Sequence, residues 1–221
     1  MNPLPKLYIG NRNYSSWSLR PWLFLRTFGV AFEDEVIALD TPEFRHQIAR
    51  VSPTLRVPVL IDGDTSIWDS LAICLYAADR WVGSRALPPE MRARAMALSI
   101  TAEMHSGFSA LRTHCPMNIR RRRSSYELPD AARADADRVQ GLWRECRQKF
   151  GAGGDFLFGA FSLADAFYAP VVTRFLSYAV PMDSVSARYA EAIMDLPGMR
   201  EWCTAAVAET WVIEATERIG A

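Results

Sequence analysis

The sequence has no long apolar run and no excess of either charge. No stretch approaches the roughly 20 apolar residues that a membrane-spanning helix needs. Lys plus Arg number 25, as do Asp plus Glu, so the formal net charge is zero. Nucleic-acid binding depends on a basic excess, which this composition does not provide. We therefore expect neither a membrane nor a nucleic acid as a partner.

The sequence also lacks paired cysteines and clusters of metal-ligating residues. The four cysteines never form a C-x-x-C motif; they are Cys74, Cys115, Cys146 and Cys203. This usage predicts buried, reduced thiols in a cytosolic protein. The first residues do not show a charged region followed by an apolar one, so we expect no export signal and a cytoplasmic location. No His, Cys and Asp residues share metal-ligand spacing, so we expect no metal.

Half of the 221 residues are hydrophobic, enough for one large domain or two small ones. Up to about residue 83 the pattern alternates between strand and helix periods. Strands are predicted at 7–10, 32–39, 59–61 and 66–68, and helices at 17–28, 41–49 and 71–81. Thr41 and Pro42 are typical of a helix start, and Asp62-Gly63-Asp64 is typical of a hairpin turn.

Residues 84–89, small residues followed by Leu-Pro-Pro, predict a linker. Beyond them, the hydrophobic residues repeat with a helical period throughout. Helices are predicted at 90–114, 131–150 and 162–176, with one or two more within 186–221. Ser162 and Asp165 are spaced as a capping box at the start of the third. The basic run at 120–123 predicts a solvated loop. The fold class is therefore α/β followed by all-α, with domains at 1–83 and 90–221.

Ser15 and Ser16 lie in a polar turn between the first strand and the first helix. Hydroxyls at such a turn are near unpaired backbone N–H groups and the positive end of the helix dipole. A serine there most often caps the helix. Both a capping and a chemical role are open for each serine.

Four segments, in this order, resemble the cytosolic glutathione S-transferases. They are NYSSWSLR at the first turn, Arg56-Val57-Pro58-Val59-Leu60, Trp68-Asp69-Ser70-Leu71-Ala72-Ile73, and FSLADAF from Phe161 to Phe167. The resemblance implies a thioredoxin-like domain with a mixed four-stranded sheet, an all-helical domain and a homodimer. The serine pair is similar to the zeta and theta classes and to a bacterial branch related to maleylacetoacetate isomerases. Trp17 stands where the zeta pattern has a cysteine.

Within that resemblance, a serine hydroxyl would activate the thiol of glutathione, the implied co-substrate. A thiol with a pKa of about 8.5 is mostly protonated at pH 7. Lowering that pKa by two units needs about 2.7 kcal/mol, which one charge-assisted hydrogen bond and a helix dipole can supply. Ser15 and Ser16 are both candidates, with Ser15 slightly ahead, and the other serine can cap the helix.

The resemblance also assigns the rest of the glutathione site. Pro58 would be cis and would hold Val57 so that its backbone pairs with the cysteine of glutathione. Asp69 would bind the γ-glutamyl ammonium, and Ser70 at a helix N-terminus would bind the γ-glutamyl carboxylate. The glycyl carboxylate needs a cation, for which the candidates are Arg56 and His46.

The second substrate is expected between the two domains, beside the sulfur. The candidate pocket residues are Tyr14, Trp17, His105, Phe108 and Arg112, the last three on one face of the predicted helix at 90–114. A single His on an amphipathic helix is usually a polar neighbour of the core. Arg112 would favour an acidic co-substrate.

Three functions agree with these residues. The first is a glutathione transferase that attacks small electrophiles, as in detoxification. The second is a glutathione-dependent cis–trans isomerase, and the third is a non-catalytic module that binds glutathione or acts as a scaffold. Thiol–disulfide exchange needs a cysteine at the first turn, and there is none. The sequence does not identify the co-substrate.

Overall fold

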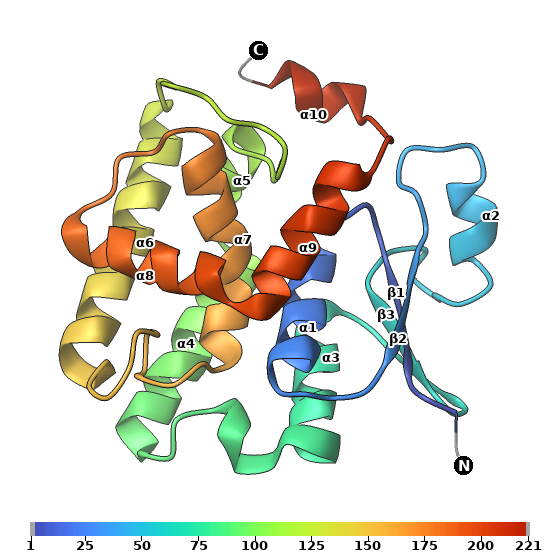
Figure 1. Ribbon diagram of the computed structural model, residues 1–221, viewed down its shortest axis with the longest axis horizontal. Coiled ribbons are helices and arrows are strands. Elements are labelled where there is room, and N and C mark those ends of the chain that lie inside the picture. Colours follow the sequence, from blue (N-terminus) through green and yellow to red (C-terminus); the bar gives the residue numbers. More distant parts are fainter. Residues whose placement is uncertain (1–2, 220–221) are drawn as a thin grey trace.

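A computed structural model describes residues 3–219 of the chain, so the ends of both expected domains, 1–2 and 220–221, lie outside the described residues (Figure 1). The strands form one mixed sheet in the order β2-β1-β3-β4. They are β1 (Lys6–Ile9), β2 (Glu33–Val36), β3 (Val59–Asp62) and β4 (Thr65–Ile67). β1 pairs with β2 in parallel and with β3 antiparallel, and β3 and β4 form an antiparallel hairpin. The predicted mixed four-stranded sheet is confirmed.

Three helices accompany the sheet and complete the predicted order βαβαββα. They are α1 (Ser16–Thr27), α2 (Phe44–Ile48) and α3 (Ser70–Ala77), after which a π turn and a 3-10 turn cover Ala78–Val82 and Gly83–Ala86. The two-residue hairpin loop contains Gly63 at φ +57°, a conformation that glycine adopts without strain. The predicted start of α2 is wrong. Its N-cap is Glu43, and the Thr41 hydroxyl instead donates to the carbonyl oxygen of Ala38.

The rest of the chain is helical. The helices are α4 (Met91–Ser106), α5 (Ser109–His114), α6 (Asp130–Phe150), α7 (Leu163–Ser177), α8 (Ser184–Asp195), α9 (Pro197–Ala208) and α10 (Glu214–Arg218). α9 returns to pack on α1, which also contacts α3 and α7 (Figure 1). After β4, residues up to 219 contain only two isolated β-bridges, near 156–160, and no strand. From residue 184 to 219 there are three helices, not the one or two that were predicted.

The single helix predicted at 90–114 is wrong, because the chain breaks between α4 and α5. A Cβ at position 107 would lie 2.7 Å from the carbonyl oxygen of Glu103, so the close backbone approach there requires Gly107. The next residue, Phe108, has φ +56° in the left-handed region, which ends a right-handed helix. α5 therefore leaves in a new direction.

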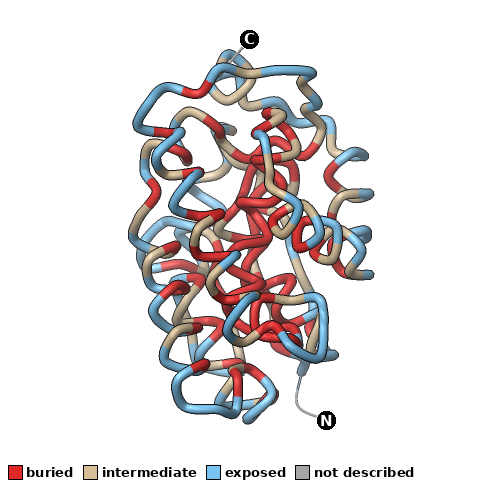
Figure 2. Tube along the Cα trace, turned by 90° about the vertical axis from the view of Figure 1, so that its left-hand side faces the viewer, coloured by how far each residue is buried: buried red, intermediate tan, exposed pale blue. Residues whose placement is uncertain are grey.

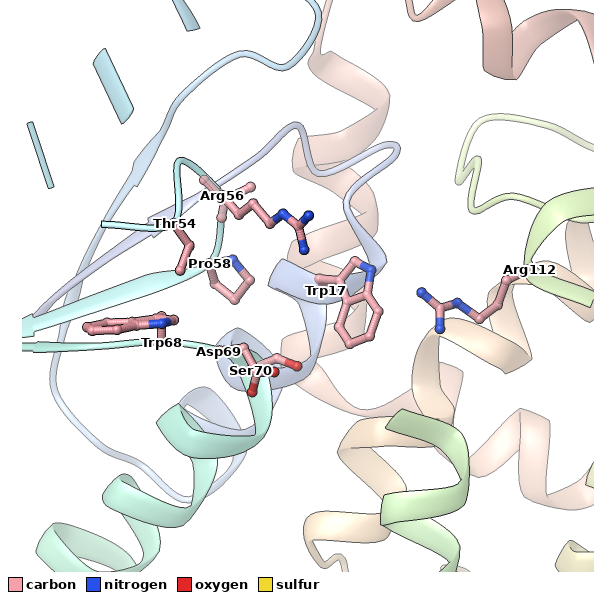
Figure 3. Close-up of a pocket in the computed structure, with 9 residues that line it drawn as sticks. Trp17, Thr54, Arg56, Pro58, Trp68, Asp69, Ser70 and Arg112 are labelled. Atoms are coloured by element: carbon pink, nitrogen blue, oxygen red, sulfur yellow. The ribbon is translucent and has the colours of Figure 1, made fainter. Parts of the chain in front are cut away.

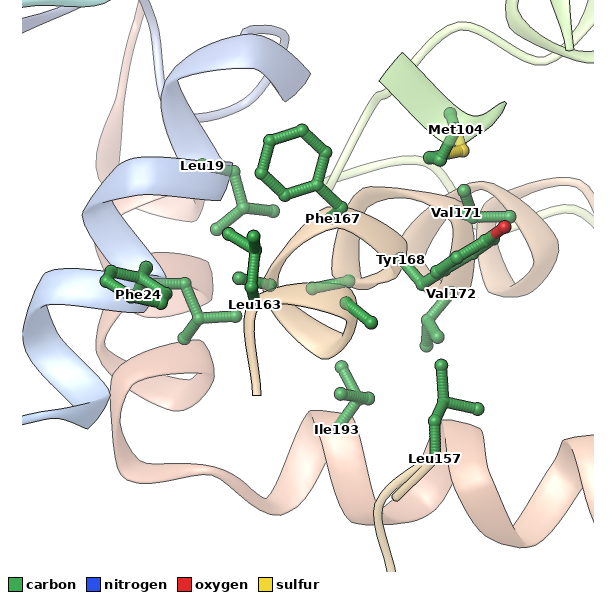
Figure 4. Close-up of a cluster of buried hydrophobic side chains, with 14 of the residues drawn as sticks. Leu19, Phe24, Met104, Leu157, Leu163, Phe167, Tyr168, Val171, Val172 and Ile193 are labelled. Carbon is green, nitrogen blue, oxygen red and sulfur yellow. The ribbon is translucent and has the colours of Figure 1, made fainter. Parts of the chain in front are cut away.

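One apolar core joins the sheet and the helical part (Figure 2). α7 is buried on nearly every side, as expected of a helix that is apolar all round. Figure 4 shows Leu163 and Phe167 of α7 facing Leu19 and Phe24 of α1. The two parts of the chain are therefore bound by a continuous packed interface, with α1 and α7 at its centre.

The prediction that 120–123 is a solvated loop is wrong. Arg120 donates to the carbonyl oxygens of Glu209 (2.6 Å) and Trp211 (2.8 Å), and Arg121 donates to that of Glu217 (2.5 Å). Carbonyl groups at and beyond a helix C-terminus have no partner within the helix, and guanidinium groups supply donors. The basic run therefore binds the segment that follows α9.

All four cysteines are free thiols. Cys74, Cys115 and Cys146 are buried as predicted, whereas Cys203 is partly exposed. Across residues 3–219, every helix is too short or too polar to cross a membrane.

Candidate functional site

Three neighbouring cavities share Trp17 as a lining residue. The first, which we call the sheet cavity, has a volume of about 420 Å³ and lies between residues 54–58, residues 68–70 and Arg112 (Figure 3). The second, the turn cavity of about 300 Å³, lies over Ser15 and Ser16. The third, the helix cavity of about 410 Å³, lies between Ser16, Arg112 and Arg174. Trp17 thus stands where the two halves of the molecule meet.

One wall of the sheet cavity is made by Val57 and Pro58, just before β3. The peptide bond between them is cis, as the resemblance implied. Pro58 is buried, and Val57 is half-buried with its backbone N–H and C=O unbonded to other residues within 3–219. An extended peptide group can pair with such a segment as a strand pairs with a sheet edge.

The opposite wall is the N-terminus of α3. Asp69 caps this helix, since its Oδ1 accepts hydrogen bonds from the N–H groups of Leu71 (2.9 Å) and Ala72 (3.3 Å). Its Oδ2 lies 3.0 Å from Nε2 of His105, whose ring meets Trp17 edge-on. The Asp69 cap was predicted. The side chain of His105 therefore supports this corner of the site, and it does not line the three cavities.

Ser70, the first residue of α3, has a fully buried hydroxyl with no hydrogen-bond partner among residues 3–219. A buried polar group without a partner is costly, typically about 1–3 kcal/mol. The hydroxyl lines the sheet cavity, and the helix dipole favours negative charge at the same place. An anionic ligand group would supply the missing partner.

The two serines of the first turn have different hydrogen bonds. The Ser15 hydroxyl donates to Oγ of Ser18 (2.8 Å), which also accepts from the N–H of Gly10 (3.0 Å). The Ser16 hydroxyl accepts a bond from the guanidinium of Arg174 (3.0 Å). Ser15 is at the N-cap of α1, but neither hydroxyl makes a capping bond, so the capping role suggested by their position is wrong.

Three arginines surround Trp17. The Arg20 guanidinium lies 4.1 Å from the Trp17 ring and 4.8 Å from the ring of Phe167, and that of Arg112 lies 4.5 Å from the Trp17 ring. Arg174 donates to the carbonyl oxygen of Cys115 (2.5 Å) as well as to Ser16. Within residues 3–219 no carboxylate forms an ion pair with any of the three.

Burial lowers the pKa of all three guanidinium groups, and repulsion from neighbouring arginines lowers the pKa of Arg20 and Arg174 further. Burial, followed by the charges of Arg112 and Arg174, lowers the pKa of Arg20 to about 9. Burial and the charge of Arg112 lower the pKa of Arg174 to about 10. Burial also lowers the pKa of Arg112. At neutral pH all three remain charged, so the cluster is a cationic region that forms no ion pair with the carboxylates of residues 3–219.

Sequence comparison places this fold and site in a known group. Residues 14–80 match the model of the glutathione S-transferase N-terminal domain, and residues 100–205 match that of the glutathione S-transferase C-terminal domain. The chain belongs to the glutathione S-transferase family. The first match includes the candidate site residues Ser15, Ser16, Val57, Pro58, Asp69 and Ser70.

Related proteins differ in their sequence identity to this chain and in the length over which they match it. A 63-residue segment is 36% identical to dichloromethane dehalogenase of Methylophilus leisingeri, spanning 26% of this chain and 22% of that protein. Glutathione S-transferase Z2 of Arabidopsis thaliana is 27% identical over 160 residues, which cover 68% of this chain and 69% of that protein. The chain thus matches less than a quarter of the length of the dehalogenase.

Solved structures agree on the fold. A glutathione transferase homologue from Burkholderia BGR1, solved with bound glutathione, superposes with a TM-score of 0.71 at 20% identity. The superposition covers 94% of this chain and all of the other. The thioredoxin-like domain followed by a helical domain is therefore confirmed.

Most of the predicted site residues lie together around the sheet cavity and the turn cavity. The structure brings Trp17, Arg56, Val57, Pro58, Asp69, Ser70 and Arg112 together at the sheet cavity. Tyr14, Ser15 and Ser16 line the turn cavity beside it. Figure 3 shows Arg112 pointing toward Trp17 from the helical side, with Arg56 near Pro58 on the other.

Besides His105, two expected residues do not line these cavities. Phe108 is 7% exposed and packs in the apolar core at the break between α4 and α5, so it does not line the pocket. Its predicted face with His105 and Arg112 depended on one continuous helix. His46 is exposed on α2 and lines none of the three cavities.

The sequence reasoning missed Thr54 and Trp68, which line the sheet cavity, and Arg20 and Arg174, which lie at Trp17 and at the helix cavity. Arg174 had a usable signal, because it is a charged residue inside the almost wholly apolar helix at 162–176. Such a charge is rarely buried unless polar partners hold it. In residues 3–219, no group of three or more His, Cys, Asp or Glu could hold a metal ion.

Proposed function

We propose that the protein is a glutathione transferase in which Ser16 stabilises the thiolate of glutathione. The observation that carries glutathione binding is the buried hydroxyl of Ser70 at the N-terminus of α3, which has no hydrogen-bond partner within residues 3–219. Ser70 and Val57 line the same sheet cavity. The family match and the glutathione-bound homologue support the same ligand.

Each part of glutathione has a matching group in the sheet cavity. Ser70 and the α3 N-terminus suit the γ-glutamyl carboxylate, and Oδ2 of Asp69 suits its ammonium. The backbone of Val57 suits the central cysteine. Arg56 is the cation for the glycyl carboxylate, since it lines both the sheet cavity and the turn cavity.

The choice of Ser16 over Ser15 follows from the direction of the hydrogen bonds that the two hydroxyls make. Guanidinium nitrogens can only donate, so Ser16 accepts from Arg174 and keeps its own O–H available for another acceptor. The Ser15 hydrogen is already given to Ser18. Ser16 is also the first residue of α1, where the helix dipole stabilises negative charge. This reverses the slight preference for Ser15 that the sequence suggested.

The three arginines favour an electrophile that carries a negative group. Ser16, Arg112 and Arg174 line the helix cavity, and within the described part of the chain, 3–219, the cluster forms no ion pair with a carboxylate. A carboxylate on the co-substrate would be attracted there. The same cluster supports a second candidate activity, the glutathione-dependent cis–trans isomerisation of an acidic conjugated substrate. Product analysis separates the two, because isomerisation consumes no glutathione.

The test is a titration of the thiolate in the enzyme–glutathione complex by its absorbance near 240 nm. Ser16→Ala should raise the thiol pKa by about one to two units, since a hydrogen bond to a charged group contributes about 1.5–3 kcal/mol. Turnover at pH 6.5 should fall about tenfold and recover partly as the pH rises. Glutathione affinity should stay nearly unchanged.

Ser15→Ala is the matched comparison and should shift the thiol pKa less. A larger shift in Ser15→Ala than in Ser16→Ala would show that the assignment is reversed. No shift in either variant would mean that backbone N–H groups or the helix dipole hold the thiolate. For the co-substrate, Arg112→Gln should raise KM for a carboxylate-bearing electrophile about tenfold and leave KM for a neutral one unchanged.

A further inference from the structure

The segment that follows α9 crosses the turn that carries Ser15 and Ser16, and then forms α10 (Figure 1). At its start, the two carboxylate oxygens of Glu209 accept hydrogen bonds from the N–H groups of Arg12 (2.7 Å) and Asn13 (3.1 Å). These are backbone groups of the turn itself, nearly 200 residues away in sequence. A carboxylate from the C-terminal part of the chain thus fixes the peptide groups just ahead of the serines.

Glu217 of α10 makes the second attachment. It accepts bonds from the Tyr14 hydroxyl (2.7 Å) and the Asn118 side chain (2.8 Å), and it pairs with Arg121 (3.0 Å). Tyr14 immediately precedes Ser15, and its hydroxyl also accepts from Arg120 (2.8 Å). Glu217 and Glu209 together hold three consecutive residues of the turn.

The pKa of Glu217 reflects this arrangement. Burial acts to raise it, but the hydrogen bonds from Tyr14, Asn118 and Arg121 outweigh burial and lower it. Burial and the bond to Glu217 raise the pKa of Tyr14. Near neutral pH, Glu217 is therefore a carboxylate and Tyr14 is a neutral phenol that donates to it.

The attachments are polar, with little apolar packing behind them. No residue of α10 is buried, and Trp211 and Val212 before it are 41% and 52% exposed. The turn has other supports that do not involve this segment: the Asn13 side chain bonds with Asn118 and with the N–H of Arg120, and the Trp202 ring donates to the carbonyl oxygen of Arg12. Loss of the segment's contacts should loosen the turn without unfolding the domain.

We propose that residues 209–219 act as a strap whose carboxylates, Glu209 and Glu217, are positioning residues for the serine turn. This inference rests on the proposed role of Ser16. The strap holds Arg12, Asn13 and Tyr14, the residues just before the serines, so that the hydroxyl of Ser16 keeps one direction relative to the sulfur. Because it is held mainly by polar contacts, it can detach locally, and turnover then depends on the fraction of molecules with the strap in place.

The experiment uses Glu209→Ala and Glu217→Ala in the full chain, with Glu214→Ala as the control. Glu214 is on α10, is exposed, and has no hydrogen bond or ion pair with the described residues. The first readout is hydrogen exchange of the Arg12 and Asn13 amides, which should be about tenfold faster in Glu209→Ala and unchanged in Glu214→Ala. This readout does not depend on the chemistry.

The second readout is the thiol titration. Both strap variants should raise the pKa of bound glutathione by about half a unit or more and lower kcat at pH 6.5, with the affinity for glutathione within twofold of the parent. Glu217→Gln, which keeps an acceptor for Tyr14 and Asn118, should restore most of kcat. These changes separate positioning from a structural role, which would lower only the thermal midpoint.

Three outcomes test the strap and its positioning role. Unchanged exchange at Arg12 and Asn13 in Glu209→Ala overturns the strap. Faster exchange with an unchanged thiol pKa, in a protein where Ser16→Ala does shift that pKa, shows that the strap is only structural and overturns its positioning role. If Ser16→Ala itself causes no shift, the proposed function of Ser16 fails, and the positioning role that rests on it fails too, while the exchange result still decides whether the strap holds the turn.

Discussion

The N-terminus of α7 is held by a buried carboxylate, and we expect its removal to destabilise the fold without changing the site. Asp165 is fully buried and accepts hydrogen bonds from the N–H of Ser162 (2.8 Å), the Ser162 hydroxyl (2.9 Å) and the N–H of Leu157 (3.1 Å). This is the capping box that the sequence predicts. It fixes both the start of the most buried helix and the loop before it.

The expected losses follow from these bonds. Ser162→Ala should cost about 1–2 kcal/mol, the usual effect of removing a cap. Asp165→Ala should cost about 2–6 kcal/mol, because it leaves two buried N–H groups without acceptors at about 1–3 kcal/mol each. For a protein of this size, each kcal/mol lowers the thermal midpoint by about 2–4 °C.

The pH dependence gives an independent check. Burial, opposed by the hydrogen bonds from Leu157 and Ser162, raises the pKa of Asp165 to about 6 from 3.8. A group whose pKa is raised in the folded state contributes stability that is complete below the unfolded pKa and is lost as the pH rises through the folded pKa. The unfolding free energy of the parent should therefore carry a contribution that increases between about pH 6.5 and pH 4, and Asp165→Asn should lack it.

Differential scanning calorimetry or urea unfolding from pH 4 to pH 8 measures both effects. Ser99→Ala is the control, since its exposed hydroxyl bonds only within α4, and it should change the unfolding free energy by less than about 0.5 kcal/mol. Equal midpoints for Ser162→Ala and the parent would refute the cap. Identical pH profiles for Asp165→Asn and the parent would refute the raised pKa.

Two further predictions concern ligand and assembly. Ser70→Ala should weaken glutathione binding about tenfold by calorimetric titration. It should leave the ligand-free protein at least as stable as the parent, because the buried hydroxyl has no hydrogen-bond partner among residues 3–219; a loss of ligand-free stability would contradict this. The protein should sediment as a homodimer at micromolar concentration, since Leu75, Met91 and Leu98 are 39%, 81% and 40% exposed on α3 and α4; a stable monomer at that concentration would refute it.

Sequence reasoning succeeded where structure is determined by nearby residues. The hairpin at Gly63, the Asp69 cap and the Ser162–Asp165 box each depend on residues a few positions apart, and each is present. The periodicity change after β4 was likewise local, and it separated strands from helices correctly. Resemblance to a family added the cis bond before Pro58, which no local pattern determines.

Two failures were local, namely the start of α2 at Thr41 and the helix break at Gly107. Others involve residues far apart in the chain. The run at 120–123 looks like a solvated loop until the segment after α9 supplies carbonyl oxygens for Arg120 and Arg121. The hydroxyls of Ser15 and Ser16 are equivalent by position. Their partners distinguish them: Ser15 donates to Ser18, and Ser16 accepts from Arg174, 158 residues further along the chain. Side-chain partners of this kind depend on the packed structure and not on spacing.

The break at Phe108 has a consequence for how substrate preference can diverge among related sequences. His105, which contacts Asp69, is on α4, while Arg112, which faces Trp17, is on α5. The two side chains are therefore carried by separate rigid segments joined at one backbone joint. Substitutions that redirect α5 can move Arg112 at the helix cavity while His105 keeps its contact with Asp69. Under the proposed function, variation on α5 would then change the preference for the co-substrate without altering the residues proposed to bind glutathione.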